Sequence, residues 1–158
     1  MVEVYRTKTN QDIDEIEPNL YLGSIFAAED QTILREFGIT HIVQVLESND
    51  ICPQFSNIVY HHSPIMDRVD GNLIRILPSA LKFIHTNLVA GGKVFVHCAA
   101  GISRSSSIIV AYLMAKHKLP FEDAYNWVKS KRSMARPNNG FQRQLKSLTQ
   151  TDLDSYLL

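Results

Sequence analysis

The hydrophobic residues of this chain follow two spacings, the alternation typical of strands and the three-to-four-residue repeat typical of helices. Alternating β-branched and polar residues predict a strand at 40–46, and a similar pattern predicts one at 57–61. A short apolar run between a glycine pair and a loop of small residues predicts a buried strand at 93–97. Helical spacing recurs in five segments: residues 27–37, 73–88 and 104–117, a segment that begins at Pro120, and residues 138–157.

Turn-forming residues separate these segments. Residues 63–72 contain proline, glycine and polar turn formers and predict a loop, whereas Pro78 should kink the helix at 73–88 or mark its true start. Residues 1–17 are polar and predict a short lead-in, which leaves residues 18–158 as a single domain. Because strands alternate with helices, we expect an α/β fold with a central mixed, mostly parallel sheet flanked by helices.

Composition and charge narrow the classes of protein. A length of 158 residues fits one domain with one core. With 45% hydrophobic and 20% charged residues, the chain is not disordered, collagen-like or a coiled coil. Sixteen Lys and Arg balance sixteen Asp and Glu, so any affinity for anions must be local, and we expect no nucleic-acid or membrane partner. The longest apolar run, residues 108–115, is too short to span a bilayer.

The chain has two cysteines, Cys52 and Cys98, and neither lies in a spacing typical of a disulfide framework or a zinc site. The histidines show no metal-ligand spacing either, so we expect no metal and no cofactor. The N-terminal residues lack the apolar core of a signal peptide. We therefore expect a reducing, cytoplasmic location, with the nucleus as an alternative. A redox partnership between the two cysteines is the less favoured role for Cys52.

One segment, VHCAAGISRS at residues 96–105, carries candidate chemistry. A strand delivers Cys98 to a loop of small residues, and a helix starts where the loop ends. Five residues separate Cys98 from Arg104, which is enough for one loop to surround a tetrahedral anion with inward backbone N–H groups. Gly101 would permit the close approach that this curvature demands. The five predicted phosphate-binding residues are Ala99, Ala100, Gly101, Ile102 and Ser103.

The side chains around this loop suggest a nucleophile and its helpers. Arg104 would bind two phosphate oxygens with its planar guanidinium. The N–H dipoles and Arg104 would favour the thiolate form of Cys98, the nucleophile, although a buried structural cysteine is the alternative. Ser105 would donate a hydrogen bond to Cys98 and ease its departure from a phosphocysteine. His97 should point to the opposite face of the strand, so we assign it to orienting the loop.

The string HCAAGISRS resembles the HCxxGxxRS pattern of the dual-specificity protein phosphatases, within the cysteine-dependent phosphatase superfamily. The resemblance extends to three flanking strings: NLYLGSIFAA, which looks like the first strand and turn of that family, GGKVFVHCAAGISRSSSIIVAYLM and RPNNGFQRQL. It covers about residues 15–148. It implies the phosphatase fold and a dual-specificity enzyme, which hydrolyses phosphotyrosine and phosphoserine or phosphothreonine on proteins through a phosphocysteine intermediate.

The resemblance also implies a general acid, an aspartate on a loop before the long helix. We prefer Asp67, which lies 31 residues before Cys98 and follows the exit of a strand. Asp70, beside a glycine, is the other candidate, and it is also typical of a turn or helix cap. By the same resemblance Asn138 would brace the phosphate loop, with a helix N-cap as its alternative role.

Three arginines near the C-terminus, Arg132, Arg136 and Arg143, predict either a rim that attracts acidic or multiply phosphorylated substrates or a solvated face. Two other functions stay open: a phosphoinositide or RNA 5′-phosphate phosphatase, and a catalytically silent phospho-binding module. The loop has no lysine, unlike many lipid-directed relatives, and the nucleophile, arginine and acid are all present. We therefore prefer a protein phosphatase whose partner is a phosphoprotein substrate.

Overall fold

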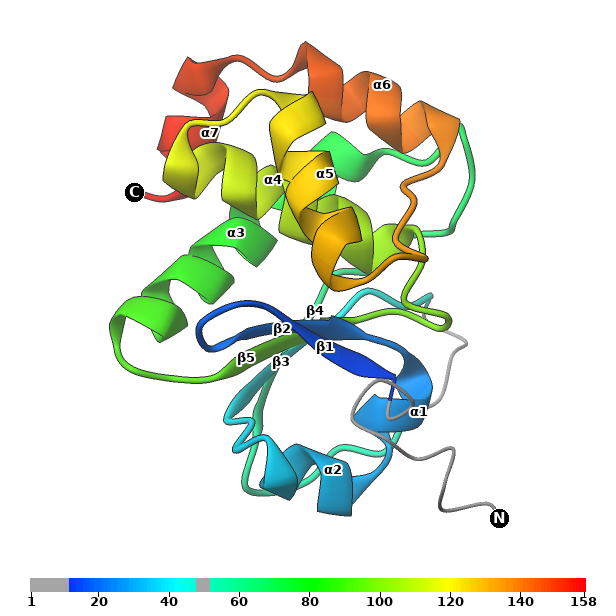
Figure 1. The fold of residues 1–158 in the computed structure, drawn as a ribbon, viewed down its shortest axis with the longest axis vertical. Helices are drawn as coiled ribbons and strands as arrows, with labels where there is room; N and C mark the ends of the chain where they lie inside the picture. Colours follow the sequence, from blue (N-terminus) through cyan, green and yellow to red (C-terminus); the bar gives the residue numbers. More distant parts are fainter. Residues whose placement is uncertain (1–11, 48–51) are drawn as a thin grey trace.

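Figure 1 shows the computed structural model of the chain, which describes residues 12–47 and 52–158, as a sheet with helices on both faces. The strands are β1 (Ile13–Glu17), β2 (Leu20–Gly23), β3 (His41–Gln44), β4 (Val59–His62) and β5 (Val94–His97). Their order is β1-β2-β5-β3-β4, with β1 antiparallel to β2 and all other neighbours parallel. The sheet is therefore mixed and mostly parallel, which confirms the predicted fold class.

The helices are divided unevenly between the two faces of the sheet. The described residues form α1 (Ile25–Ala28), α2 (Gln31–Glu36), α3 (Leu73–Val89), α4 (Arg104–His117), α5 (Phe121–Lys131), α6 (Asn139–Ser147) and α7 (Gln150–Tyr156). In Figure 1, α3 to α7 gather on one side of the sheet, and α1 and α2 lie on the other. Among the described residues, no helix combines the length and the apolar character needed to cross a bilayer.

The alternation of side chains along each strand builds two cores, one on either face of the sheet. In β2, Leu20 and Leu22 belong to the larger core with α3 to α7, whereas Tyr21 belongs to the smaller core with α1 and α2. Helix α4 is buried almost all round, since it contacts the other four helices of its layer and strands β2 and β5. The start of α4 is therefore held firmly, and this is where the candidate loop ends.

Ordered structure begins before Pro18, contrary to the prediction that residues 1–17 are a lead-in. Residues 13–17 form the edge strand β1, with Ile13 buried in the smaller core and Ile16 in the larger. These two isoleucines lie three positions apart among acidic neighbours, so they face opposite sides of the sheet and leave no visible alternation. Residues 1–11 lie outside the described part of the chain.

Two predicted helices are each divided in two by a capping residue. The predicted helix at 27–37 is α1 followed by α2, because the Asp30 side chain accepts from two backbone N–H groups at 3.0 and 3.2 Å and starts a new helix. The predicted helix at 138–157 is α6 followed by α7, which begins with a capping box between Thr149 and Asp152. Asp30 and Thr149, the polar residues that cap α2 and α7, mark these breaks in the sequence, but the helical spacing of the apolar residues continues across them.

The long helix α3 begins at Leu73, so Pro78 lies inside it and does not mark its start. Its N-terminus is capped twice. The Asn72 side chain accepts from the Arg75 N–H at 3.2 Å, and the Gln144 Oε1 from α6 accepts from the Leu73 N–H at 2.8 Å. These caps fix the end of the loop that carries Asp67 and Asp70.

Candidate active site

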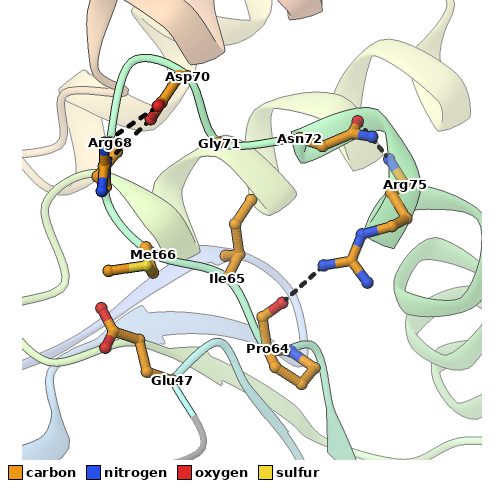
Figure 2. A pocket seen from close by; sticks show the side chains of 9 residues that line it. All are labelled: Glu47, Pro64, Ile65, Met66, Arg68, Asp70, Gly71, Asn72 and Arg75. Atoms are coloured by element: carbon orange, nitrogen blue, oxygen red, sulfur yellow. Dashed lines mark hydrogen bonds and ion pairs between the residues drawn. The ribbon is translucent and has the colours of Figure 1, made fainter.

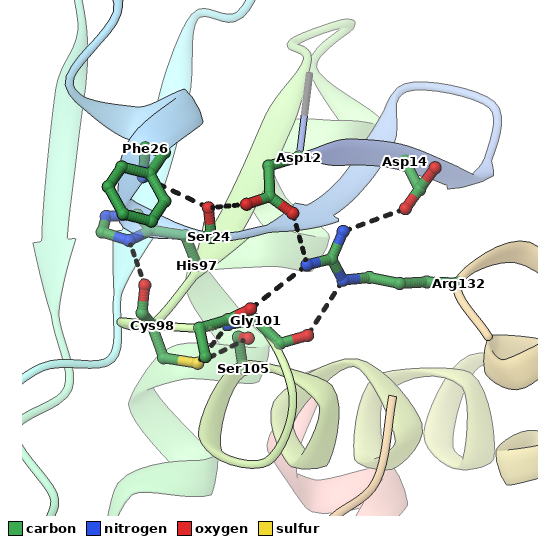
Figure 3. A network of polar contacts seen from close by, with 10 residues as sticks. Asp12, Asp14, Ser24, Phe26, His97, Cys98, Gly101, Ser105 and Arg132 are labelled. Carbon is green, nitrogen blue, oxygen red and sulfur yellow. Dashed lines mark hydrogen bonds and ion pairs between the residues drawn. The ribbon is translucent and has the colours of Figure 1, made fainter. Parts of the chain in front are cut away.

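The loop between β5 and α4 folds around the thiol of Cys98, which is only 2% exposed. The Cys98 Sγ lies 3.1 Å from the Ser105 Oγ and accepts the Gly101 N–H at an N···S distance of 3.2 Å (Figure 3). Hydrogen-bond donors to sulfur stabilise its thiolate form. When Cys98 is a thiolate, the Ser105 hydroxyl is necessarily the donor of that pair. Gly101 and Ser105, two of the residues predicted to surround Cys98, are therefore in contact with its sulfur.

All six backbone carbonyls from Cys98 to Ser103 accept hydrogen bonds from groups outside the predicted five-residue loop. A trans peptide unit points its C=O and its N–H in opposite directions, so the N–H groups of this stretch turn toward the inside. This is the arrangement that binds a phosphate. In chain order, the donors are His97 Nδ1 at 3.1 Å, the Ile25 N–H at 3.0 Å, Arg132 Nη2 at 3.2 Å, Arg132 Nε at 2.9 Å, the Arg136 N–H at 2.7 Å and the Ser107 N–H at 3.0 Å.

Gly101 is required by the curvature of the loop. Its φ is +69°, in the left-handed region. A Cβ there would lie 2.6 Å from the carbonyl of Gly23 at the end of β2 and 2.7 Å from the Arg132 guanidinium. Both the backbone conformation and the close approach exclude a side chain at this position.

His97 lies beneath the loop, on the face of the sheet opposite to α4. Its ring is fully buried and 5.6 Å from the ring of Phe95, which belongs to the smaller core. Because a carbonyl can only accept, the His97 Nδ1 carries the proton that it shares with the Cys98 carbonyl. Burial lowers the pKa of His97 to about 4, although this hydrogen bond opposes the shift. A neutral His97 therefore holds the backbone of Cys98.

Arg104 links the phosphate loop to the neighbouring loop between β4 and α3. Its side chain comes from the first turn of α4 and is nearly buried, at 9% exposure. The Arg104 Nη1 donates to the Ile65 carbonyl at 3.2 Å. A guanidinium has five N–H donors in one plane, so it can make this contact and still present a fork to phosphate oxygens.

The two candidate acids, Asp67 and Asp70, have different surroundings on that neighbouring loop. The Asp67 Oδ1 accepts from the Asn138 Nδ2 at 2.9 Å, and the backbone N–H of Asn138 donates to the Ser103 Oγ at 2.9 Å. Asn138 thus connects Asp67 to the phosphate loop. Asp70 instead makes a two-pronged ion pair with Arg68, at 3.0 and 3.1 Å, on the exposed surface. Of the two carboxylates, Asp67 is the one joined to the site.

The segment RPNNGFQRQL holds the loop of Asp67 in place from the side of α6. The Asn138 Oδ1 caps α6 by accepting from the Phe141 N–H at 2.8 Å, so the predicted helix N-cap is present, alongside the contact of the Asn138 backbone N–H with Ser103. Gly140 allows close packing, since a Cβ there would lie 1.9 Å from the Val69 carbonyl. The Gln144 Nε2 donates to the Gly71 carbonyl at 2.7 Å.

Arg132 is a buried clamp on the phosphate loop, which the sequence did not reveal. It is 3% exposed, and besides the Ala100 and Gly101 carbonyls it binds two carboxylates (Figure 3). The Arg132 Nη1 lies 3.0 Å from Asp14 and its Nη2 lies 3.0 Å from Asp12. Burial raises the pKa of Asp14, although Arg132 opposes that shift.

Both roles predicted for Arg132, a place in a substrate-attracting rim and a place on a solvated face, are therefore wrong. Both carboxylates that it binds are more than a hundred positions away along the chain, so no local pattern marks the contact. Arg136 and Arg143 are exposed, as either of their predicted roles requires.

The remaining candidates lie apart from the site. Cys52 packs against the smaller core and Cys98 belongs to the larger one on the opposite face of the sheet, and both thiols are free. Burial raises the pKa of the Cys52 thiol, with Glu29 adding to the shift. A redox pair between the two cysteines is thus not formed in this fold. Among the described residues, no three His, Cys, Asp or Glu side chains are grouped to hold a metal ion.

A thiol at the base of an anion-binding loop, an arginine at the following helix N-terminus and a carboxylate on the adjoining loop define the class of cysteine-dependent phosphatases. Sequence comparison narrows that class. The profile of the family described as "Dual specificity phosphatase, catalytic domain" matches residues 20–151. The chain belongs to this family and is a protein phosphatase, as its sequence predicted.

Similar proteins cover most of the chain. Dual specificity protein phosphatase 1 of Arabidopsis thaliana is 40% identical over 150 residues, which is 94% of this chain and 75% of the relative. Human dual specificity protein phosphatase 22 is 36% identical over 144 residues, 91% of this chain and 77% of the relative. The crystal structure of human tyrosine phosphatase-like serine/threonine/tyrosine-interacting protein matches with a TM-score of 0.82 and 37% identity, covering 86% of this chain and 94% of that one.

Proposed function

We propose that this chain removes phosphate from phosphotyrosine and from phosphoserine or phosphothreonine in proteins, with Cys98 as nucleophile and Asp67 as acid and base. The observation that carries this assignment is the unbroken set of outward hydrogen bonds on the carbonyls from Cys98 to Ser103. Those bonds fix the inward N–H groups before substrate arrives, so the charge of the transferring phosphoryl group meets dipoles that need no reorganisation.

In the first step the phosphate binds to the loop N–H groups and to the guanidinium of Arg104. The Cys98 thiolate attacks phosphorus, and the bond between phosphorus and the side-chain oxygen of the substrate breaks. That oxygen takes a proton from the Asp67 carboxyl group and leaves as a neutral hydroxyl. The product is a phosphocysteine on Cys98 and a dephosphorylated protein.

In the second step water attacks the phosphocysteine. The Asp67 carboxylate takes a proton from that water, the bond between phosphorus and sulfur breaks, and inorganic phosphate leaves. Ser105, whose Oγ lies 3.1 Å from the sulfur, donates to the departing thiolate and makes it a better leaving group. The contact between Asn138 and Asp67 holds the carboxylate in position for both steps.

The exposure of the site supports dual specificity, and the chemistry of Cys98 supports a cytoplasmic location. Residues 66–70 and Ile102 are exposed, so the site opens at the surface and short as well as long phosphorylated side chains can reach the sulfur. Because Cys98 acts only as a reduced thiolate, a cytoplasmic location is the natural setting, and a protein phosphatase there acts in phosphorylation signalling.

The test is hydrolysis of one peptide that carries both phosphothreonine and phosphotyrosine, followed site by site by mass spectrometry. The Cys98→Ser protein is the blank. We expect loss of both phosphates with the wild type, inhibition by vanadate, and no effect of a metal chelator. Loss of phosphotyrosine alone would contradict dual specificity. Release from neither residue would contradict the protein-phosphatase assignment, and phosphoinositides and 5′-phosphorylated RNA would be assayed next.

A further inference from the structure

Large hydrophobic side chains are concentrated around the opening of the site. Eight are exposed among the described residues, and five of these lie in the phosphate loop or in segments that contact it. Single exposed hydrophobic residues are common on protein surfaces, but a group of them marks a surface that binds something. The five, each between 40% and 68% exposed, are Phe26, Met66, Val69, Ile102 and Met134.

Three of the five lie on or directly beside the phosphate loop. Ile102 is a loop residue, and its carbonyl accepts the Arg136 N–H at 2.7 Å, two positions after Met134. Phe26 follows Ile25, whose N–H donates to the Ala99 carbonyl at 3.0 Å. These backbone contacts bring Phe26 and Met134 to the border of the loop that holds the phosphate.

The other two lie on the loop that carries the general acid. Met66 precedes Asp67 and Val69 follows it by two positions. The side-chain contact between Asp67 and Asn138 joins this loop to the phosphate loop. The five side chains therefore lie on segments that border the phosphate loop, the region where residues next to a bound phosphate would pass.

The charged groups near this opening largely cancel. The groove beside Met66, of about 540 Å³, is lined by Arg68 and Arg75 and by the two acidic residues Glu47 and Asp70 (Figure 2). The same groove has an apolar wall of Pro64, Ile65 and Met66. Arg68 is already paired with Asp70, and Arg136 adds one exposed positive charge beside Met134. This balance offers little attraction to a strongly acidic segment.

We infer that Phe26, Met66, Val69, Ile102 and Met134 form an apolar rim that receives aliphatic or aromatic residues next to the phosphorylated residue of the substrate. The inference rests on the proposed function and narrows its substrate class: phosphoprotein segments with apolar flanks, in preference to acidic or multiply phosphorylated ones. The free energy gained when apolar side chains come into contact is roughly proportional to the apolar area removed from water. Apolar residues next to the phosphorylated residue therefore supply affinity that the phosphate alone does not.

The experiment compares three phosphotyrosine peptides that differ only in the residues on either side of the phosphotyrosine: leucine and valine, glutamine and asparagine, or aspartate and glutamate. The readout is kcat/KM. Partial burial of two apolar side chains predicts that the apolar peptide exceeds the polar one by about tenfold, and the acidic one by at least as much. A preference for the acidic peptide, or equal rates for all three, overturns the inference.

Two variants locate the preference on the rim. The double substitution Phe26→Gln and Met134→Gln should reduce the tenfold ratio to about twofold, while turnover of a small aryl phosphate, which does not reach the rim, stays unchanged. Val89→Gln is the matched control, because Val89 is 74% exposed at the far end of α3. Loss of the preference in the control, or its retention in the double variant, overturns the inference.

Binding of the same peptides to the Cys98→Ser protein separates this inference from the proposed function. If the wild type does not hydrolyse even the small aryl phosphate, the proposed function fails. The affinities of the three peptides for Cys98→Ser then decide the inference without turnover. Tighter binding of the apolar peptide supports the rim, and equal affinities overturn it.

Discussion

In the proposed mechanism the phosphate loop and the loop that carries Asp67 act on the same substrate, but the two loops are held in different ways. In the phosphate loop every carbonyl from Cys98 to Ser103 is bonded, and Cys98 and Ser103 are buried. In the loop between β4 and α3 that carries Asp67, which we call the acid loop, residues 66–70 are all exposed. It is anchored near its ends, where Ile65 accepts from Arg104 and Gly71 accepts from Gln144, and in its middle by the contact between Asp67 and Asn138.

This contrast matches what each loop must recognise. The phosphoryl group is the same in every substrate, so a fixed set of dipoles can be matched to its transition state. The leaving groups of phosphotyrosine and phosphoserine differ in length, so an acid on an exposed loop, positioned through the Asn138 side chain, can meet each of them. The rigid phosphate loop therefore matches the part of the reaction that is the same for every substrate, and the more exposed loop of Asp67 matches the part that varies.

The largest expected effect separates the two carboxylates of the acid loop. Asp67→Asn removes the proton that the leaving oxygen needs, so kcat should fall by about 10²–10⁴-fold with little change in KM. Asp70→Asn, which breaks only the exposed pair with Arg68, should leave kcat within about twofold. Steady-state kinetics on a phosphopeptide measures both. The assignment of the acid is wrong if Asp70→Asn gives the large loss and Asp67→Asn does not.

Next in size is the loss of the clamp on the phosphate loop. Arg132→Met removes the donor of two loop carbonyls and the ion-pair partner of Asp12 and Asp14, so we expect a loss of about 3 kcal/mol in the free energy of unfolding. Misdirected N–H groups should also lower kcat/KM by about 10²-fold. Urea unfolding, kinetics and vanadate affinity are the measurements, and exposed Lys131→Met is the control.

Arg132→Lys sharpens the same test, since lysine keeps the positive charge but lacks the planar fork. It should recover part of the stability and little of the vanadate affinity. If Arg132→Met destabilises the protein but binds vanadate as the wild type does, Arg132 supports only the fold and does not position the loop.

His97 makes the stability of the folded protein depend on pH. Its pKa in the folded protein is about 4, below the usual 6.5, so the unfolded chain binds more protons between these two values. The contribution of His97 to stability is therefore complete above about pH 6.5 and is lost as pH falls toward 4, by about 3 kcal/mol in all. His97→Asn keeps a donor for the Cys98 carbonyl but does not titrate. Urea unfolding between pH 4 and pH 7 gives the free energy of unfolding as a function of pH, and this free energy should rise less steeply with pH in His97→Asn than in the wild type. Parallel curves for the two proteins would contradict the prediction.

The smallest expected effects concern the link between the two loops. Asn138→Ser keeps a cap for α6 but loses the amide that holds Asp67, so stability should change by less than about 0.5 kcal/mol while kcat falls by about threefold to tenfold. Asn138→Ala should lose the cap as well, at about 1 kcal/mol. Kinetics and urea unfolding of both variants measure the two roles separately. Unchanged kcat in Asn138→Ser would show that the contact with Asp67 does not assist catalysis.

The parts of the site that the sequence predicted are those encoded in consecutive residues. A buried strand, a small-residue loop and a helix follow one another from residue 93 to 117, and the predicted helix at 104–117 has the bounds of α4. Spacing alone placed Cys98, Gly101, Arg104 and Ser105 in one structure. The choice of Asp67 over Asp70 came from family resemblance, and its catalytic role stays a prediction.

What the sequence did not predict depends on contacts between distant residues. Arg132 finds Asp12 and Asp14 only because β1 joins the sheet beside β2 and brings them to the loop. The edge strand itself was missed, since it has only two buried residues. The sequence shows that Arg132 is charged but not whether it is buried, so it cannot tell an arginine that binds the loop from one on a solvated face. Burial depends on how the whole chain folds.

The burial of α4 has a consequence for how such an enzyme can change. Because the helix behind the phosphate loop is packed on nearly all sides, down to the three fully buried serines Ser105, Ser106 and Ser107, a substitution there disturbs the core as well as the chemistry. The exposed loop and the apolar rim touch little of that core. New substrate preferences can therefore be selected or engineered at the edge of the site, while the reaction itself is inherited with the fold.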